Sequence, residues 1–396
     1  MADNRMRDAI MAALATVQDP EIRRPITDLG MVEGVEIDGG AVTVHVLLTV
    51  AGCPLQSTLE DDARTAVGRV EGVTQVDVVM GVMNDEQRAN MVTRLGNGRA
   101  DANPFASPDC PTRVLVIASG KGGVGKSSVT ANLAVALAEQ GKRVGLLDAD
   151  VYGHSIPAMM GVADEHPMMV EDVLMPVMAH GVATMSLGLM KESRDQVIAW
   201  RGPMLDRALA QMLTDVYWGD LDYLLVDLPP GTGDMPMSVG RQLPTGQVLV
   251  VTTPNQAAAE VAERAGALAG RMNQPVIGVI ENMSWLETQC PHCGQPHRVE
   301  VFGVGGGAAV ADALTARSGD PVPLVAQIPL DAAVRKGADD GRPVVLAAPD
   351  CPAAQAIKSL AVRLSPSLGA ALGADDSIHL ETSRDHATGR VPDLNG

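Results

Sequence analysis

The sequence contains few aromatic residues, few cysteines and no long apolar run. Phe, Tyr and Trp together make up 2% of its 396 residues. No apolar run approaches the ~18 residues that a membrane-spanning helix requires. Five cysteines are too few for a disulfide framework in a chain of this length, so we predict a protein of the reducing cytoplasm. The short apolar stretch at 9–17 is flanked by acidic residues, which favours a buried helix over a signal peptide.

Positive charge is scarce as well. The 48 acidic residues outnumber the 30 Lys and Arg residues, and the net charge is −18. A surface of this charge repels phosphate backbones and anionic lipid headgroups. We therefore expect neither nucleic acid nor a membrane among the partners. The polar, aperiodic residues 371–396 predict a disordered tail rather than an amphipathic membrane helix.

Three segments of the remaining chain differ in hydrophobic pattern. Residues 1–92 predict a small α+β domain, with a helix at 55–70 and strands at 31–37, 41–49 and 73–80. Residues 93–111 are rich in Gly, Pro, Ala and Asp and predict a linker. Residues 112–370 alternate amphipathic helices with short strands that are apolar on both faces, as a sheet buried between two helix layers requires. We predict an α/β fold with a mostly parallel sheet and helices on both faces, its strands lying at 114–119, 144–148, 223–227, 248–253, 276–281 and 322–327.

A glycine-rich segment, GKGGVGKS at 120–127, follows the first of these strands and precedes a helix pattern. It satisfies G-x-x-x-x-G-K-[ST] in the strand–loop–helix context that a P-loop requires. The main-chain N–H groups of such a loop face phosphates, its lysine holds the β- and γ-phosphates, and the next hydroxyl ligates Mg²⁺. The segment predicts a site for ATP and Mg²⁺ formed by Gly120, Lys121, Gly122, Gly123, Val124, Gly125, Lys126, Ser127 and Ser128.

The lysine directly after the first glycine, Lys121, is typical of a subclass of P-loop proteins. The pattern K-G-G-V-G-K-S resembles the deviant Walker A motif of the MinD, ParA and nitrogenase iron-protein ATPases. The resemblance implies that Lys121 reaches the nucleotide bound in a second subunit, where it acts like an arginine finger supplied in trans. A solvated lysine on the loop is the alternative.

Acidic residues follow the neighbouring strands. Asp148 and Asp150, in LLDAD, stand at the carboxyl end of the second strand, where open α/β sheets bind their ligands. Asp227 ends YLLVD and is the candidate Walker B aspartate, and Asp234 in PPGTGD is a candidate sensor of the γ-phosphate. Helix capping is the alternative role for each of them. The predicted Mg²⁺ ligands are Ser127, Asp148 and Asp227, and the predicted catalytic residues are Lys121, Lys126, Asp150 and Asp227.

Two of the cysteines, Cys290 and Cys293, form a C-x-x-C motif. A tetrahedral zinc site or an iron–sulfur cluster needs four ligands, and the sequence has no second C-x-x-C. His292 and His297 could complete a zinc site, and a redox dithiol is a further alternative. Two copies of the chain related by a two-fold axis would instead supply four thiolates, and the role that the resemblance implies for Lys121 independently requires such a dimer.

Seven motifs in order resemble the Mrp/ApbC family of iron–sulfur cluster carrier ATPases. They are SGKGGVGKSS, LLDADVYG with SIP, WRGPM at 200–204, LLVDLPPGTGD, GVIENMS at 278–284, CPHCG and FGVGGG at 302–307, and they cover 112 to about 365. The resemblance implies a homodimer in which Cys290 and Cys293 of each chain hold a bridging [4Fe–4S] cluster. It implies as partners a cluster-assembly scaffold and client apoproteins. It also implies that Asn282 contacts the adenine base, the alternative being a turn or cap residue.

The first 92 residues resemble the small domain of SufT-like iron–sulfur assembly factors. The matching segments are VQDPEI at 17–22, DLGMV at 28–32 and T-x-x-x-C-P at 49–54. Cys53 stands where that domain commonly has a reactive cysteine, and a buried inert cysteine is the alternative. The carrier domain departs from its family at His154, where proline is usual. This change leaves Asp150 in place and puts the stiffness of the switch I loop in question, the alternative being a solvated histidine.

Two other functions would use the same P-loop. A MinD- or ParA-like positioning ATPase shares every phosphate-site residue, but it accounts neither for the C-x-x-C nor for the added N-terminal domain. A P-loop metabolic enzyme would need a second substrate pocket, for which the sequence has no motif. We therefore predict an ATP-hydrolysing carrier that loads or transfers iron–sulfur clusters.

Overall fold

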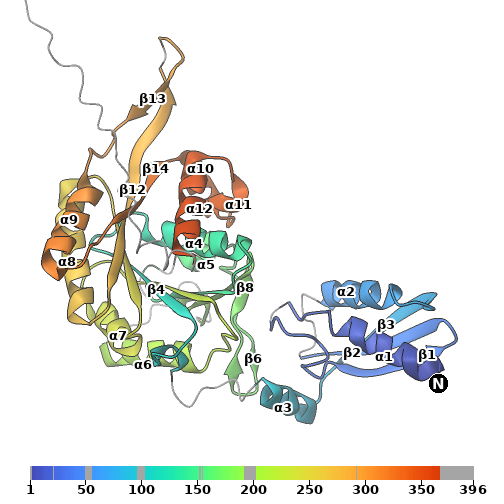
Figure 1. Cartoon of the computed structure of the whole chain (residues 1–396). Helices are drawn as coiled ribbons and strands as arrows, with labels where there is room; N and C mark the ends of the chain where they lie inside the picture. The colour runs from blue at the N-terminus through green and yellow to red at the C-terminus, as the bar shows by residue number, and fades with distance from the viewer. Residues whose placement is uncertain are drawn as a thin grey trace, which may run out of the picture.

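The computed structural model describes residues 2–20, 22–49, 56–95, 103–150, 153, 155–190, 202–290 and 292–365. Cys53, His154 and the predicted tail from 371 therefore lie outside the described residues, and the exact domain bounds stay predictions. Figure 1 shows a small N-terminal part, in blue, beside a larger part that holds the rest of the chain. No helix among the described residues is long and apolar enough to cross a bilayer.

The N-terminal part is built on a three-stranded sheet. Strand β2 (Ala41–Leu48) pairs antiparallel with β1 (Val32–Asp38) and parallel with β3 (Gln75–Val82). Val42, Val44 and Val46 alternate with polar or smaller residues along β2, so one face of this strand is buried. The helices are α1 (Ala2–Leu14), α2 (Gln56–Gly68) and α3 (Asp85–Arg94). The prediction of a small α+β domain is confirmed.

The larger sheet, which has nine strands among the described residues, is mostly parallel. Its order is β13-β12-β11-β4-β10-β5-β9-β8, with β14 beside β12. The parallel strands are β4 (Arg113–Ser119), β5 (Val144–Asp148), β9 (Val182–Ser186), β10 (Tyr223–Asp227), β11 (Gln247–Thr252), β12 (Val276–Gln289) and β14 (Leu324–Leu330). Two short strands, β8 (Val177–Ala179) and β13 (Pro296–Val299), run antiparallel to their neighbours.

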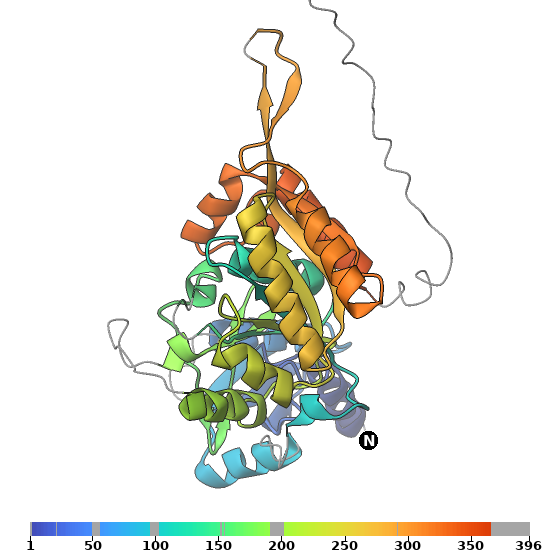
Figure 2. The ribbon, with the colours of Figure 1, turned by 90° about the vertical axis from the view of Figure 1, so that its left-hand side faces the viewer.

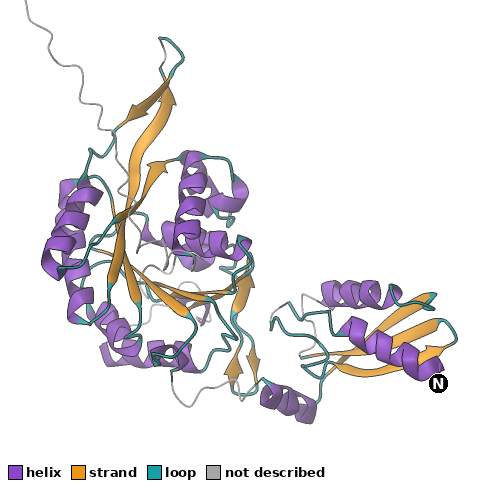
Figure 3. Ribbon diagram, in the orientation of Figure 1, coloured by secondary structure: helices purple, strands orange, loops and turns teal. Residues whose placement is uncertain are grey.

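Helices cover both faces of this sheet, as Figure 3 shows. Along β4, Val114 and Val116 pack into the core on one face, whereas Leu115 and Ile117 pack into the core on the other. This is why the strand is apolar at successive positions, and it confirms the predicted α/β fold. One layer contains α6 (Gly202–Thr214), α7 (Asp234–Gln242), α8 (Gln256–Arg271) and α9 (Gly306–Ser318). The other contains α4 (Lys126–Glu139), α5 (Ile156–Met159), α10 (Ala332–Asp339), α11 (Val344–Ala347) and α12 (Pro352–Leu364).

Three strand predictions are wrong in their bounds by two or more residues, and one of them, at 73–80, corresponds to β3 at 75–82. Strand β12 continues past Glu281 to Gln289, and the last strand begins at Leu324 rather than Val322. The extension of β12 pairs with β13 in an exposed hairpin, so it carries no apolar run that periodicity could detect. Figures 1 and 2 show this hairpin projecting beyond the helices. Two further short strands, β6 (Met169–Val170) and β7 (Val173–Leu174), were also missed, because a strand of two residues is too short to show a periodic pattern.

The N-terminal part packs on the β6–β7 hairpin of the larger part. Val170, Val173 and Met175 belong to the same apolar cluster as the core of the N-terminal domain. Arg88 lies 3.7 Å from the carboxylate of Glu171 in the hairpin. The contact therefore combines buried apolar side chains with an ion pair at their edge.

Part of the predicted linker packs on the larger domain. Its second half contains a short 3₁₀ helix, η1 (Pro104–Ala106), whose Phe105 is buried against the edge of Trp218, with 6.4 Å between ring centroids. A single aromatic residue among Gly, Pro and Ala gave no periodic signal, although burial of its ring fixes this part of the chain on the larger domain.

Candidate nucleotide site and cysteine hairpin

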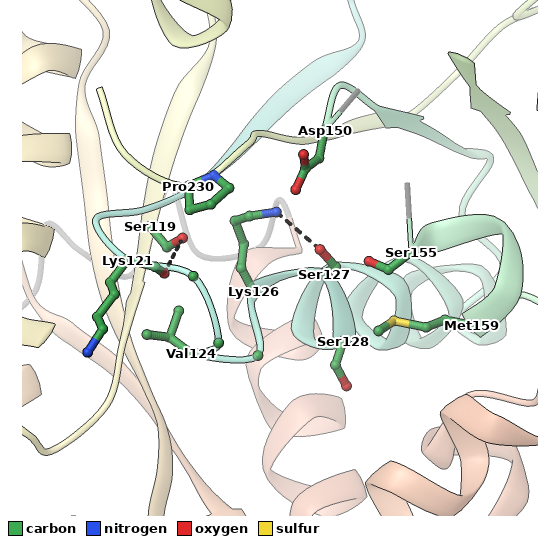
Figure 4. Close-up of a pocket in the computed structure, with 13 residues that line it drawn as sticks. Ser119, Lys121, Val124, Lys126, Ser127, Ser128, Asp150, Ser155, Met159 and Pro230 are labelled. Carbon is green, nitrogen blue, oxygen red and sulfur yellow. Dashed lines mark hydrogen bonds between the residues drawn. The ribbon is translucent and has the colours of Figure 1, made fainter. Parts of the chain in front are cut away.

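The predicted P-loop surrounds a cavity of about 270 Å³ at the carboxyl end of β4. Gly123 and Gly125 have φ angles of +81° and +79°, which L side chains rarely adopt. A Cβ atom on Gly120 would lie 2.1 Å from the main-chain carbon of Val261, so this position also requires glycine. Figure 4 shows the lining residues, which are Ser119, Lys121, Gly122, Gly123, Val124, Gly125, Lys126, Ser127, Ser128, Asp150, Ser155, Met159 and Pro230.

Helix α4 begins at Lys126, so its free N–H groups and the positive end of its dipole face the cavity. The Nζ atom of Lys126 lies 2.6 Å from Oδ2 of Asp227, and the hydroxyl of Ser127 donates to the same oxygen at 2.6 Å. Lys126 is 5% exposed and Asp227 is fully buried. The buried carboxylate is thus neutralised by the lysine that a P-loop uses for phosphates.

Asp148 and Asp227 occupy matching positions on the adjacent parallel strands β5 and β10. Burial and the negative charge of Asp227 raise the pKa of Asp148 to about 8. Hydrogen bonds oppose this rise, since the hydroxyl of Ser186 donates to Asp148 at 3.0 Å and the main-chain N–H of Asp150 donates at 3.0 Å. Two carboxyl groups are therefore held together at one edge of the sheet, in a water-poor environment.

The oxygen atoms brought together here fit a hard divalent cation. Mg²⁺ prefers one or two carboxylates, a hydroxyl, phosphate oxygens and water. Asp148 and Asp227 supply two carboxylates and Ser127 supplies a hydroxyl. They lie beside the glycine-rich loop, whose main-chain N–H groups fit a phosphate. The set predicted from sequence is thus assembled in one place, with Asp150 on the wall of the same cavity.

Lys121 differs from Lys126 in its surroundings. It is exposed, and in Figure 4 its side chain extends away from Lys126. Its main-chain oxygen accepts a hydrogen bond from the hydroxyl of Ser119 at 3.2 Å, which holds the loop and leaves the ammonium group outside. The geometry within one chain is that of a lysine directed outward.

Asp234 lies beside the phosphate cavity rather than on its wall. It begins α7 and lines a second cavity of about 550 Å³. That cavity shares Asp150 and Pro230 with the first, so the two adjoin. The position is compatible with a γ-phosphate sensor, and the role stays a prediction.

Asn282 contacts the P-loop itself. Its side-chain amide donates to the main-chain oxygen of Val124 at 2.9 Å, and the residue is 8% exposed. It is not among the described residues that line the cavity. Contact of Asn282 with adenine therefore stays a prediction. What the structure shows is the hydrogen bond from its amide to the main chain of the P-loop.

Cys290 and Cys293 lie at the tip of the β12–β13 hairpin. The turn is closed by hydrogen bonds from the N–H of Cys290 to the oxygen of Gln295 at 2.9 Å and from Gly294 to Cys290 at 2.8 Å. Main-chain hydrogen bonds from Cys293 and His292, the first being the larger cause, lower the pKa of the Cys290 thiol. Below the tip, the guanidinium of Arg298 lies 4.2 Å from the ring centre of Trp285 and braces the two strands.

A zinc site at the hairpin stays an alternative prediction. His292 and His297 are exposed, and within the described part of the chain no group of three or more His, Cys, Asp or Glu side chains is placed to hold a metal ion. Cys110 packs against the core, and Cys351 caps α12, its sulfur accepting from Ala354 at 3.4 Å. These two cysteines have local structural roles.

The sequence analysis did not identify two hydroxyl-bearing residues that contact Asp148 and Asp227. Thr130 on α4 lies 2.6 Å from Asp227, and Ser186 at the end of β9 contacts Asp148. Neither belongs to the phosphate-binding pattern. The one available signal for Ser186 was its position at the end of a strand, beside the predicted acids.

The loop, the lysine–aspartate pair and the strand ends define a P-loop NTPase. Comparison with known proteins agrees: a family model described as NUBPL iron-transfer P-loop NTPase matches residues 111–365, and one described as iron–sulfur cluster assembly protein matches 7–78. An iron–sulfur cluster carrier protein of Mycobacterium leprae is 48% identical over 94% of this chain and 97% of its own length. An iron–sulfur cluster carrier protein of Deinococcus radiodurans is 42% identical over 91% of this chain and 95% of its own length.

Among solved structures, a nucleotide-binding protein of Archaeoglobus fulgidus in complex with ADP is 36% identical, covers 58% of this chain and 86% of its own, and has a TM-score of 0.48. The family models and the full-length relatives settle the classification. The chain belongs to the family of iron–sulfur cluster carrier proteins, with an N-terminal iron–sulfur cluster assembly domain. The family resemblance noted in the sequence is thereby confirmed.

Proposed function

We propose that this chain is a cytoplasmic ATP hydrolase that carries a [4Fe–4S] cluster between two copies of itself and transfers the cluster to apoproteins. The observation that carries the proposal is the exposed hairpin, whose turn holds Cys290 and Cys293 directly after the strand that also contacts the P-loop. The proposed partners are a second copy, client apoproteins and a scaffold that supplies the cluster.

The number of ligands supports the second copy. A [4Fe–4S] cluster is held by four thiolates, and each hairpin offers two. A two-fold axis through the tips brings equivalent pairs together, as an isologous interface requires. The lowered pKa of Cys290 favours the thiolate, which is the form that binds iron.

Exposed apolar side chains around the hairpin support the same assembly. Leu286 and Val299 face each other across its strands, and Val301, Phe302 and Val304 follow directly. Their exposed fractions range from 36% to 66%. An apolar patch of this kind is typical of an interface, and it includes a strand pair of the same hairpin that carries the two cysteines at its tip.

We assign the nucleotide chemistry to the residues of the phosphate cavity. Lys126 and the loop N–H groups would bind the β- and γ-phosphates, and Asp150 would orient the attacking water. Ser127, Asp148 and Asp227 would hold Mg²⁺, which neutralises charge on the phosphates when bound. The exposed Lys121 would complete the site of the partner subunit, where its charge stabilises the transition state.

Anaerobic reconstitution tests the proposal. Wild type should bind about four irons and four sulfides per dimer, with thiolate-to-iron absorbance. Cys290→Ser and Cys293→Ser should lose the cluster and its transfer to an apoprotein, yet keep most ATP hydrolysis, because no phosphate contact changes. Cys110→Ser and Cys351→Ser are matched controls that should hold a normal cluster. A tightly bound zinc in each monomer, independent of dimer state, would refute the carrier mechanism.

A further inference from the structure

Thr130 stands one helical turn after Lys126 and is fully buried. Its Oγ1 lies 2.6 Å from Oδ1 of Asp227 and 2.9 Å from the main-chain oxygen of Lys126. We infer that Thr130 is a positioning residue for the metal site: its hydroxyl fixes the orientation of the Asp227 carboxylate. The inference rests on the proposed function in so far as Asp227 is taken as an Mg²⁺ ligand.

The Thr130 hydroxyl donates the hydrogen bond to Asp227. A threonine hydroxyl has one proton to donate, and both neighbours at short range are acceptors. The bond to a carboxylate is the stronger, and the 2.6 Å separation is that of a charge-assisted O–H···O bond. The contact with the Lys126 oxygen is the back-contact that β-branched hydroxyl residues commonly make in helices.

Both oxygens of Asp227 are thereby held from a single helix. Thr130 takes Oδ1, while Ser127 and Lys126 take Oδ2. Rotation of the carboxylate would break bonds on both sides at once. With the carboxylate fixed through Oδ1, Oδ2 would be held in place as a ligand for Mg²⁺.

Thr130 is fully buried and is not one of the described residues that line the phosphate cavity, so we place its effect behind Asp227 rather than on the nucleotide. Its effect on the metal must pass through Asp227. Partners that orient a metal-binding carboxylate typically contribute 10- to 100-fold to metal affinity. Asp148 is held in the same manner by Ser186, so hydroxyl support of both acids is a repeated feature of this site.

The test compares ADP affinity with and without Mg²⁺ by calorimetry, using full-length protein. Thr130→Val removes the hydroxyl but keeps the branched shape. We expect it to bind ADP normally in EDTA and to lose roughly 10-fold of the Mg²⁺-dependent gain in affinity. Thr130→Ser restores the hydroxyl and should behave as wild type. Thr93→Val, which removes an equivalent helix back-bond on α3, is the matched control and should change neither value.

The outcomes separate this inference from the proposed function. A full Mg²⁺ gain in Thr130→Val, or an equal loss in Thr130→Ser, would overturn the positioning role and leave the metal site intact. No Mg²⁺ gain in wild type would overturn the metal site and the inference together, without bearing on cluster binding by Cys290 and Cys293. Should Thr130→Val fail to fold, Thr130→Ala removes the same hydroxyl with less bulk beside the carboxylate.

Discussion

The side-chain amide of Asn282 donates a hydrogen bond to the main-chain oxygen of Val124, joining strand β12 to the P-loop at 2.9 Å. A Cβ on the neighbouring Gly125 would lie 2.2 Å from this amide nitrogen, so the two segments are in close contact. The same strand leads outward to Cys290 at the hairpin tip. One continuous strand therefore contacts both the nucleotide loop and the candidate cluster ligands.

Asn282→Ala should weaken nucleotide binding, because the buried oxygen of Val124 loses its partner at a cost of about 1–3 kcal/mol. Measuring the affinities for ADP and for pyrophosphate separates two roles. Support of the loop predicts a loss for both ligands, whereas contact with adenine predicts a loss for ADP alone. Asn255→Ala, which removes the exposed cap of α8, is the control and should leave both affinities unchanged. Unaltered binding of both ADP and pyrophosphate by Asn282→Ala would contradict both roles.

Lys126→Ala and Lys121→Ala should both abolish most ATP hydrolysis, but only the first should lower stability. Lys126 is buried against the carboxylate of Asp227, and removing one partner of a buried ion pair costs about 3–5 kcal/mol. Lys121 is exposed, so thermal unfolding of Lys121→Ala should match wild type. Mixing the two variants should restore part of the activity, since a mixed dimer contains one complete site. Full activity of Lys121→Ala alone would contradict action in trans.

The free energy of unfolding should fall as the pH rises from about 4 to 8, in part because of Asp148. The pKa of its carboxyl is raised to about 8 in the folded protein, whereas an aspartate in the unfolded chain titrates near ~3.9. Between these values the native state holds more protons than the unfolded state, so deprotonation favours unfolding. Above the folded pKa the contribution levels off.

Asp148→Asn removes this titration and should give a flatter profile when urea unfolding is measured at pH 5, 6, 7 and 8. Asp350→Asn, which changes an exposed acid, should keep the slope of wild type. A wild-type slope in Asp148→Asn would show that the proton is held elsewhere.

Val304→Asp should weaken self-association, because it places a charge in the apolar patch beside the hairpin. Val304 is 66% exposed, so the substitution leaves the core of the monomer untouched. Light scattering across a dilution series gives the dimer affinity. Val362→Asp, on α12 and 60% exposed, is the matched control and should dimerise as wild type. Equal dimer affinity in both variants would place the interface elsewhere.

Local features were readable from the sequence alone. The P-loop follows from glycines and a lysine at fixed spacing, because a loop that binds phosphate through its main chain needs those residues whatever surrounds it. The alternation of apolar strands and amphipathic helices likewise predicted the buried parallel sheet. Asp148 and Asp227 followed from it, since the carboxyl ends of parallel strands share one edge.

Contacts between distant segments were decided by the tertiary structure. Thr130 and Asp227 are 97 residues apart, and Asn282 and Val124 are 158 apart, so their meeting depends on the register of strands and the packing of α4. Local spacing carries no information on such a register. The β12–β13 hairpin escaped prediction because its exposed strands bury no apolar face. The sequence by itself thus determined which groups are predicted to bind phosphate, whereas the packing of the sheet decided which hydroxyls and amides contact those groups.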